Sequence, residues 1–161
     1  MEFFNRDITV DEQGRREELI ERQTKVLNEQ GREHCGTLQL VYTNDVETVT
    51  VLEAKTIING QEYPVPATAI ENKPLASDAS GLDSKALLTV AFPNTRVGAS
   101  LYLKYKLVVK TPPLPNYFAT GFHYGGLNKC WTRSRVTVSS KIKATLALLT
   151  GGDQEGCSRD F

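Results

Sequence analysis

The clearest pattern in the chain is a strict alternation of apolar and polar positions over residues 101–110. A period of two is typical of a strand with one buried side and one solvent-facing side. We therefore predict a half-buried strand over Leu101–Lys110. Its inner side would carry Leu101, Leu103, Tyr105, Leu107 and Val109, and its outer side would carry Lys104, Lys106 and Lys110.

Two later runs have the same period. In residues 131–138, Arg133 and Arg135 fall on one side, opposite two valines. In residues 141–148, four apolar residues fall on one side, and Lys141 and Lys143 fall on the other. The pair Ser139–Ser140 lies between these runs, so the segment forms either a bend or one long broken strand.

The N-terminal half has the pattern of strands joined by short turns. The turn signals are Asp11–Gly14, Asn28–Gly31 and Asn59–Gly60, the last of which suits a type I′ hairpin turn with positive φ at both positions. The apolar residues of Arg16–Leu27 fit a helical period as well as a strand, and the surrounding turns favour the strand. The predicted strands are Phe4–Val10, Arg16–Leu27, Glu33–Tyr42, Val46–Ile58, Gln61–Val65 and Lys85–Phe92.

Two segments have no period and are predicted to be long loops. They are residues 66–84, with one short helical turn at Ala67–Ile70, and Thr111–Tyr124. About eight to ten strands, no long helix and two long loops predict an all-β fold, an antiparallel β-sandwich. We expect a single domain over residues 1–150, followed by a flexible tail or the start of a linker over residues 151–161.

The composition is that of an ordinary globular protein. The chain has 161 residues, 40% hydrophobic and 24% charged, which excludes a disordered or fibrous protein. No apolar run is long enough to span a bilayer. No basic-then-apolar signal peptide opens the chain, so either the protein is cytoplasmic or a leader has been removed.

Charge is balanced overall and uneven along the chain. Residues 1–80 carry 8 basic and 15 acidic side chains, whereas residues 81–161 carry 11 and 4. One hypothesis is a basic sheet face around Lys104, Lys106, Arg133 and Arg135 that binds an anionic glycan, lipid or peptide. The other interpretation, which we favour, is a solvated face complementary to the acidic N-terminal half or to a following domain. Overall neutrality argues against nucleic acid as a partner.

The long second loop is rich in aromatic side chains. They could form an exposed patch that docks a partner or a sugar, and the alternative that we favour is that they cap the core. The candidate binding residues in and after this loop are Tyr117, Phe122, His123, Tyr124 and Trp131.

The cysteines and histidines supply no catalytic pattern. On the predicted strand, His34 and Cys35 would point to opposite faces, so the histidine could not activate the thiol. The pattern contains no nucleophile elbow, phosphate-binding loop or zinc spacing, and we expect no catalytic residue, metal or cofactor. Cys35 is expected to be a small buried apolar residue, while a bridge between Cys130 and Cys157 remains open.

The order of the elements resembles a bacterial β-sandwich domain of unknown function that precedes transglutaminase-like, papain-fold domains. The resemblance covers residues 15–146 and rests on a series of short sequence motifs that follow the family's order and spacing. These are Thr24–Arg32, Leu40–Tyr42, Val49–Ile57, Asn59–Gly60 with Val65–Pro66, Ala69–Ile70, Val90–Pro93 and Val97–Lys106.

The resemblance implies a non-catalytic accessory domain of a cysteine protease or acyltransferase. In such proteins the Cys-His-Asp chemistry belongs to the downstream domain, which would be this chain's partner, so no catalytic residue is transferred to this sequence. The family is often periplasmic or secreted, and the chain is expected to be a fragment of a longer protein. The alternative is a stand-alone module that binds an anionic ligand through the basic sheet face.

Overall fold

A computed structural model of the chain describes residues 2–75, 84–112, 118, 120 and 132–142. The elements within these ranges are β1 (Phe3–Val10), β2 (Arg16–Lys25), α1 (Glu29–Cys35), β3 (Thr37–Thr43), β4 (Glu47–Ile58), β5 (Gln61–Pro64), the 3-10 turn η1 (Ala67–Ala69), β6 (Ile70–Pro74), β7 (Lys85–Ala91), β8 (Ser100–Val109) and β9 (Arg133–Ser140).

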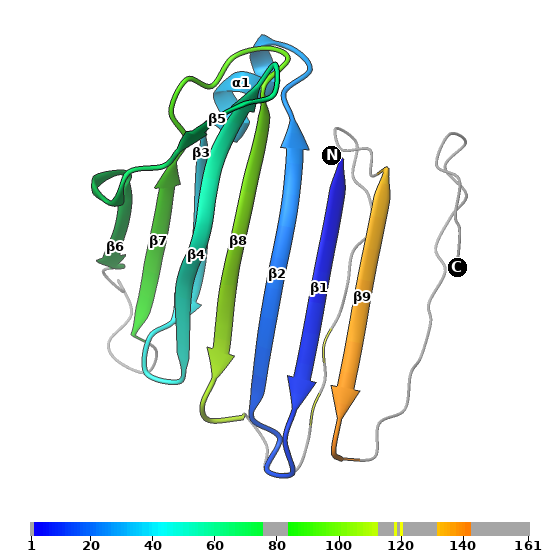
Figure 1. Ribbon diagram of the computed structural model, residues 1–161. Coiled ribbons are helices and arrows are strands. Elements are labelled where there is room, and N and C mark those ends of the chain that lie inside the picture. The colour runs from blue at the N-terminus through cyan, green and yellow to red at the C-terminus, as the bar shows by residue number, and fades with distance from the viewer. Residues whose placement is uncertain (1, 76–83, 113–117, 119, 121–131, 143–161) are drawn as a thin grey trace.

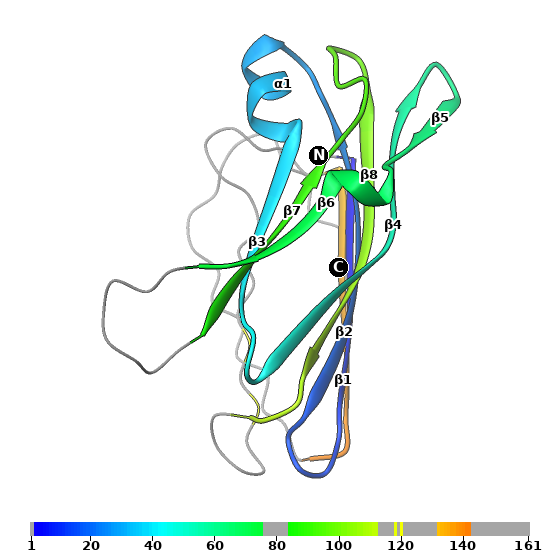
Figure 2. The same cartoon turned by 90° about the vertical axis from the view of Figure 1, so that its left-hand side faces the viewer.

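The described strands form two sheets, which confirms the predicted all-β sandwich. Six strands make the larger sheet in the order β5-β4-β8-β2-β1-β9, and three make the smaller one in the order β3-β7-β6 (Figure 1). Figure 2 shows the smaller sheet on one side of the larger, with its strands crossing at an angle. We call the side of the larger sheet that faces the smaller one its inner face, and the opposite side its outer face.

The core lies between the two sheets and follows the alternation in β8. Leu101 and Leu103 are 3% and 1% exposed and pack with Ala54, Val90 and Phe92. A neighbouring cluster is formed by Tyr42, Ala86 and Leu88 of the smaller sheet. The small sheet therefore covers the β4 and β8 part of the inner face, as the period of two in β8 requires.

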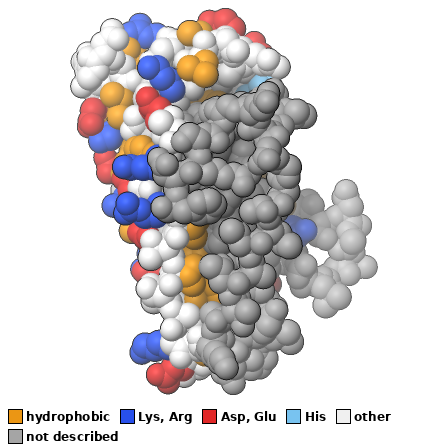
Figure 3. Space-filling model, turned by 90° about the vertical axis from the view of Figure 1, so that its right-hand side faces the viewer, with side chains coloured by type: hydrophobic (Ala, Val, Ile, Leu, Met, Phe, Trp, Pro, Cys, Tyr) orange, Lys and Arg blue, Asp and Glu red, His pale blue; other side chains and the backbone are white. Residues whose placement is uncertain are grey.

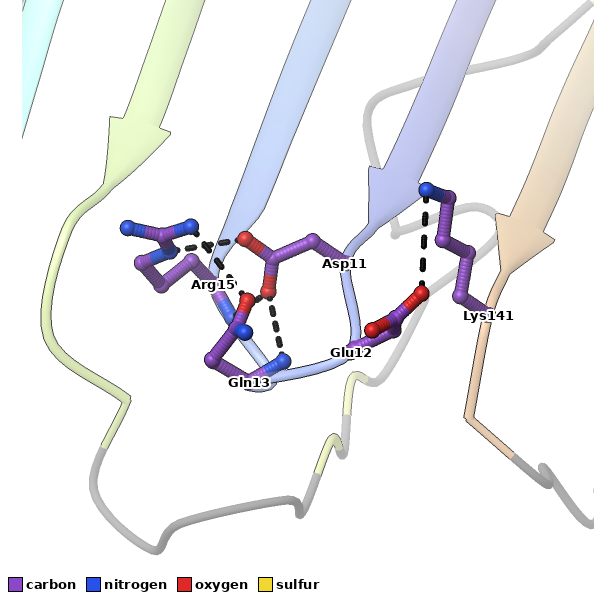
Figure 4. Close-up of polar contacts among 5 residues, drawn as sticks. All are labelled: Asp11, Glu12, Gln13, Arg15 and Lys141. Atoms are coloured by element: carbon purple, nitrogen blue, oxygen red, sulfur yellow. Dashed lines mark hydrogen bonds and ion pairs between the residues drawn. The ribbon is translucent and has the colours of Figure 1, made fainter.

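The turn between β1 and β2 is held by a local polar network (Figure 4). The Asp11 carboxylate accepts hydrogen bonds from the backbone N–H groups of Gln13 and Arg15 and from Arg15 Nε at 2.7 Å. Desolvation raises the pKa of Asp11, but these hydrogen bonds outweigh it and hold the pKa below its usual value. Beyond the turn, Lys141 Nζ lies 4.0 Å from Glu12, and the Lys141 backbone N–H donates a hydrogen bond to the Val10 carbonyl at 3.1 Å.

The turn between β4 and β5 has the predicted hairpin geometry. Asn59 and Gly60 have φ values of 51° and 80°, which is the pair of positive values that a type I′ turn requires. Strands β4 and β5 pair directly on either side of this two-residue turn, with Ile58 opposite Gln61.

The prediction for residues 28–42 was partly wrong. The strand expected from Glu33 begins instead at Thr37, because residues 29–35 form the helix α1. Asn28 caps this helix by accepting a hydrogen bond from the Gly31 N–H at 2.7 Å. All seven helical residues are at least partly exposed, so no apolar period marked the helix in the sequence. The strand interpretation of residues 16–27 is confirmed over β2, which ends at Lys25.

The loop expected over residues 66–84 contains one strand that the sequence pattern did not predict. Strand β6 is largely polar and exposed, and it pairs with β7 from Ile70 opposite Val90 to Pro74 opposite Ala86. The predicted short helical turn is present as η1. Residues 76–83 lie outside the described part of the chain.

Strands β8 and β9 run in the same direction with β2 and β1 between them. The pairing of β9 with β1 is parallel. This pairing departs from the predicted antiparallel sandwich. Two described residues of the β8–β9 connection, Phe118 and Thr120, contact inner-face arginines.

Other predictions fall on residues that the structure does not describe. They include the strand over residues 143–148, most of the aromatic loop and the tail over residues 151–161. Among the described residues, the one α-helix has seven residues, and no helix could span a membrane.

Candidate functional site

The outer face of the larger sheet carries the predicted basic residues in rows that cross five strands. In each row, the register places one residue of β4, β8, β2, β1 and β9 side by side. The first row contains Lys55, Tyr102, Gln23, Phe3 and Arg133, and the second contains Glu53, Lys104, Glu21, Asn5 and Arg135. The third contains Thr50, Lys106, Leu19, Asp7 and Thr137, and the fourth contains Thr48, Val108, Glu17, Thr9 and Ser139.

The predicted lysines and arginines share this face but are not neighbours. Lys104 and Lys106 lie on β8, whereas Arg133 and Arg135 lie on β9, and β2 and β1 separate them. Three strand spacings correspond to about 14 Å. The two basic pairs are therefore separate features rather than one patch.

Carboxylates of β2 and β1 lie on the outer face between the two basic pairs. Lys106 Nζ lies 2.6 Å from Glu17 of β2, and Lys104 lies opposite Glu21 in the register. Figure 3 shows basic and acidic side chains interspersed along the described part of its view. Where the structure describes it, the outer face is therefore mixed in charge, and one of its lysines pairs with a glutamate from the acidic half of the chain.

The first row joins two cations through two aromatic rings. Lys55 Nζ lies 5.1 Å from the centre of the Tyr102 ring, whose centre lies 6.4 Å from that of Phe3 in an edge-to-face arrangement. The Arg133 guanidinium lies 5.9 Å from the Phe3 ring centre. Cation–π and aromatic pairs of this kind stabilise by about 0.5–1.5 kcal/mol each.

The surroundings of Tyr102 and Lys55 in this row favour the protonated form of each side chain. Burial raises the pKa of Tyr102, and the hydrogen bond that its hydroxyl donates to Glu21 at 2.6 Å raises it further. Hydrogen bonds to Glu53 and Glu62 raise the pKa of Lys55. Tyr102 therefore remains a neutral donor and Lys55 a cation at neutral pH.

The two β9 arginines differ from the lysines of β8 in their neighbours, because Lys104 and Lys106 each lie opposite or paired with a glutamate of β2, whereas the β1 neighbours of Arg133 and Arg135 are Phe3 and Asn5. Arg133 and Arg135 are both exposed, and neither forms an ion pair with a carboxylate of the described residues. Asn5 of β1, which is half-buried, lies beside Arg135 in the register.

The inner face holds a buried charge cluster that sequence reasoning missed. The Glu18 side chain is 1% exposed, and its Oε2 accepts from Arg6 Nε at 2.8 Å and lies 2.7 Å from Arg6 Nη2. Arg16 Nε lies 2.8 Å from Glu18 Oε1 but is not aligned for a hydrogen bond, so this contact is electrostatic. Arg6 also donates to Thr120 at 3.3 Å, and Arg16 lies 5.9 Å from the Phe118 ring centre.

The signal for this cluster was present in the sequence. Glu18 has the same parity as buried Ile20 in β2, and Arg22 follows on the same side. Burial lowers the pKa of Arg22, and the nearby Tyr105 and Cys35 partly oppose this change. Charged side chains are nevertheless expected to face water, so parity alone did not predict a buried cluster.

The thiol and imidazole at positions 34 and 35 lie at the end of α1 rather than on a strand. Cys35 packs against the core but is only partly buried, so the expected fully buried residue was partly wrong, and His34 is exposed. Among the described residues, no group of three His, Cys, Asp or Glu side chains could hold a metal. Tyr117, Phe122, His123, Tyr124, Trp131, Cys130 and Cys157 lie outside the described residues.

A family model and a solved structure each match most of this chain. The structure is similar to that of a "putative protease" from Parabacteroides distasonis, with a TM-score of 0.69 and 17% identity. The similarity covers 86% of this chain and 28% of the other, so this chain spans little more than a quarter of its length. At that identity the likeness shows a shared fold, and no curated protein matches the sequence. Residues 12–148 match the domain of unknown function DUF3857, a family with a solved structure, and the chain therefore belongs to that family.

Proposed function

We propose that this chain is a non-catalytic accessory domain of a larger, protease-like protein. The observation that carries the proposal is the difference in coverage, because the shared fold accounts for most of this chain and 28% of the Parabacteroides protein. A domain of this size would stand beside other domains that make up the rest of such a protein. Its role would be to support a catalytic domain or to present its substrate.

The partner that we propose is a transglutaminase-like domain of the same polypeptide, which would carry the Cys-His-Asp chemistry. The sequence resemblance supports this partner, and the same resemblance supports a periplasmic or secreted location. The outer face of the larger sheet supports an interaction role, since arginine and aromatic side chains are enriched in protein interfaces. Phe3, Tyr102 and Arg133 supply these residue types in one row.

The described residues also support a domain without an active site of its own. A cysteine nucleophile needs an exposed thiolate beside a base, whereas Cys35 packs against the core and its neighbour His34 is exposed. The inner-face Glu18 is neutralised by two arginines within 2.8 Å, an arrangement that holds a carboxylate in place rather than presenting it to a substrate.

Hydrolysis of fluorescently labelled casein tests this function. We expect turnover by the complete gene product and none by the 161-residue chain at the same molar concentration. A Cys35→Ser variant of the chain serves as the control for trace activity. Turnover by the chain that disappears in Cys35→Ser would contradict the proposal and make this domain an enzyme.

A further inference from the structure

The outer-face cations differ in whether the chain itself neutralises them. Lys55 lies 2.8 Å from both Glu53 and Glu62, and Lys106 lies 2.6 Å from Glu17. Arg133 and Arg135 have no such carboxylate among the described residues. Among the described residues, Lys104 has no ion-pair partner either, but it lies between Glu21 and Glu53 in the register. Within the same part of the chain, the β9 end of the face is thus the part whose cations have no carboxylate as an ion-pair partner or direct register neighbour.

The two arginines are arranged to act together. They lie two residues apart on β9 and share its outer side, which places their Cα atoms about 6.6 Å apart. The Arg133 guanidinium lies 5.9 Å from the centre of the Phe3 ring, a contact that favours a position over that ring. A guanidinium can bind a carboxylate through two parallel hydrogen bonds, so this edge fits a segment that presents two carboxylates at a similar spacing.

The rest of the face selects among anionic partners. The four rows contain five basic and four acidic side chains, so the face as a whole is close to neutral. A uniformly anionic membrane or glycan lying across it would meet Asp7, Glu17 and Glu21, which repel it. A folded protein can place its carboxylates over β9 and other groups over β1 and β2.

We propose that Arg133 and Arg135, together with the Phe3 ring, form a docking surface for an acidic segment of another domain of the same gene product. This inference rests on the proposed function, because it names the surface through which the accessory domain would contact its partner. Arginines beside an aromatic ring are the residue types that dominate binding energy at protein interfaces. Lys104 and Lys106, which β2 carboxylates flank, lie outside this surface.

Arginine labelling with phenylglyoxal, read by mass spectrometry, tests the surface. The complete gene product and the 161-residue chain are labelled under the same native conditions. We expect Arg133 and Arg135 to react more slowly in the complete product by at least about tenfold, the effect of one strong interface contact. Arg96, which is exposed in the loop before β8, should react at the same rate in both.

Two double variants of the complete product separate docking from general charge. Hydroxyl-radical oxidation of Phe3 should be suppressed in the complete product, should return to the rate of the isolated chain in Arg133→Ser/Arg135→Ser, and should stay suppressed in Lys104→Ser/Lys106→Ser. Far-UV circular dichroism checks that each variant is folded. Protection that survives the arginine substitutions would overturn the proposed surface.

The remaining outcomes distinguish the two proposals. Equal arginine labelling in a complete product that contains another domain would overturn the docking surface and leave the accessory role intact. A gene product that ends at Phe161 would overturn both. Salt-sensitive binding of the isolated chain to heparin oligosaccharides or to phosphatidylserine vesicles, lost in Arg133→Ser/Arg135→Ser, would replace the protein partner with an anionic glycan or lipid.

Discussion

Replacing Glu18 by glutamine tests how the inner-face charges hold the larger sheet together. The glutamine has the same shape but removes the negative charge that faces Arg6 and Arg16. Removing one partner of a fully buried ion pair costs about 3–5 kcal/mol, because it leaves the other charge uncompensated. Here the two arginines are 17% and 22% exposed, so water offsets part of the cost and we expect a loss of about 2–4 kcal/mol.

Urea unfolding followed by far-UV circular dichroism measures this loss in the free energy of unfolding. For a chain of this size, a loss of about 3 kcal/mol corresponds to a decrease in Tm of about 6–12 °C. The matched control is Glu17→Gln, the preceding residue on the opposite face, whose 54% exposed side chain pairs with Lys106 at 2.6 Å. An exposed pair contributes less than about 1 kcal/mol. Equal losses in the two variants would refute the reasoning that burial gives Glu18 its importance.

Three further substitutions test local features of the fold. Thr56→Val removes the buried hydroxyl that donates to the Pro93 carbonyl at 2.6 Å and should cost about 1–2 kcal/mol in urea unfolding, whereas Thr56→Ser should cost less. Gly60→Ala should lower the free energy of unfolding by about 1–2 kcal/mol from backbone strain alone. The φ of Gly60 is +80°, and no heavy atom lies within 4 Å of the new Cβ. A loss below about 0.5 kcal/mol would contradict the turn geometry. The lowered pKa of Asp11 means that its carboxylate stabilises the fold above about pH 4 and loses this effect as the pH falls through the folded-state pKa. Asp11→Asn should therefore lower Tm at pH 7, and the difference from the wild-type Tm should shrink steadily below about pH 4; a difference independent of pH would contradict it.

Patterns that depend on neighbouring residues could be predicted from the sequence. The alternation in Leu101–Lys110 identified both sides of β8, because side-chain direction in a strand depends on parity alone. The Asn59–Gly60 pair identified its hairpin, because positive φ at two successive positions is a local requirement. Both features appear in the structure at the predicted residues.

Features that depend on long-range pairing could not be predicted in this way. Strand β9 pairs with β1 across more than a hundred residues of sequence and in the parallel direction, which no local pattern records. Strand β6 has a polar sequence and exists because β7 offers it hydrogen bonds. The short helix α1 depends on the Asn28 cap rather than on an apolar period.

The candidate site shows the same division. Parity correctly placed Arg133 and Arg135 on one side of β9 and Lys104 and Lys106 on one side of β8. Only the strand order shows that β2 and β1 lie between them and bring Glu17 to Lys106. The opposite charges of the two halves of the chain thus meet within one sheet, which the composition alone could not show.

The most direct test of the accessory-domain account is to determine the coding sequence beyond Phe161. The account predicts a further domain with a papain-like arrangement of cysteine, histidine and aspartate, joined to this sandwich in one polypeptide. A stop codon directly after Phe161 would contradict it. The sandwich would then act alone, and the exposed arginines of β9 would have to serve a separate ligand.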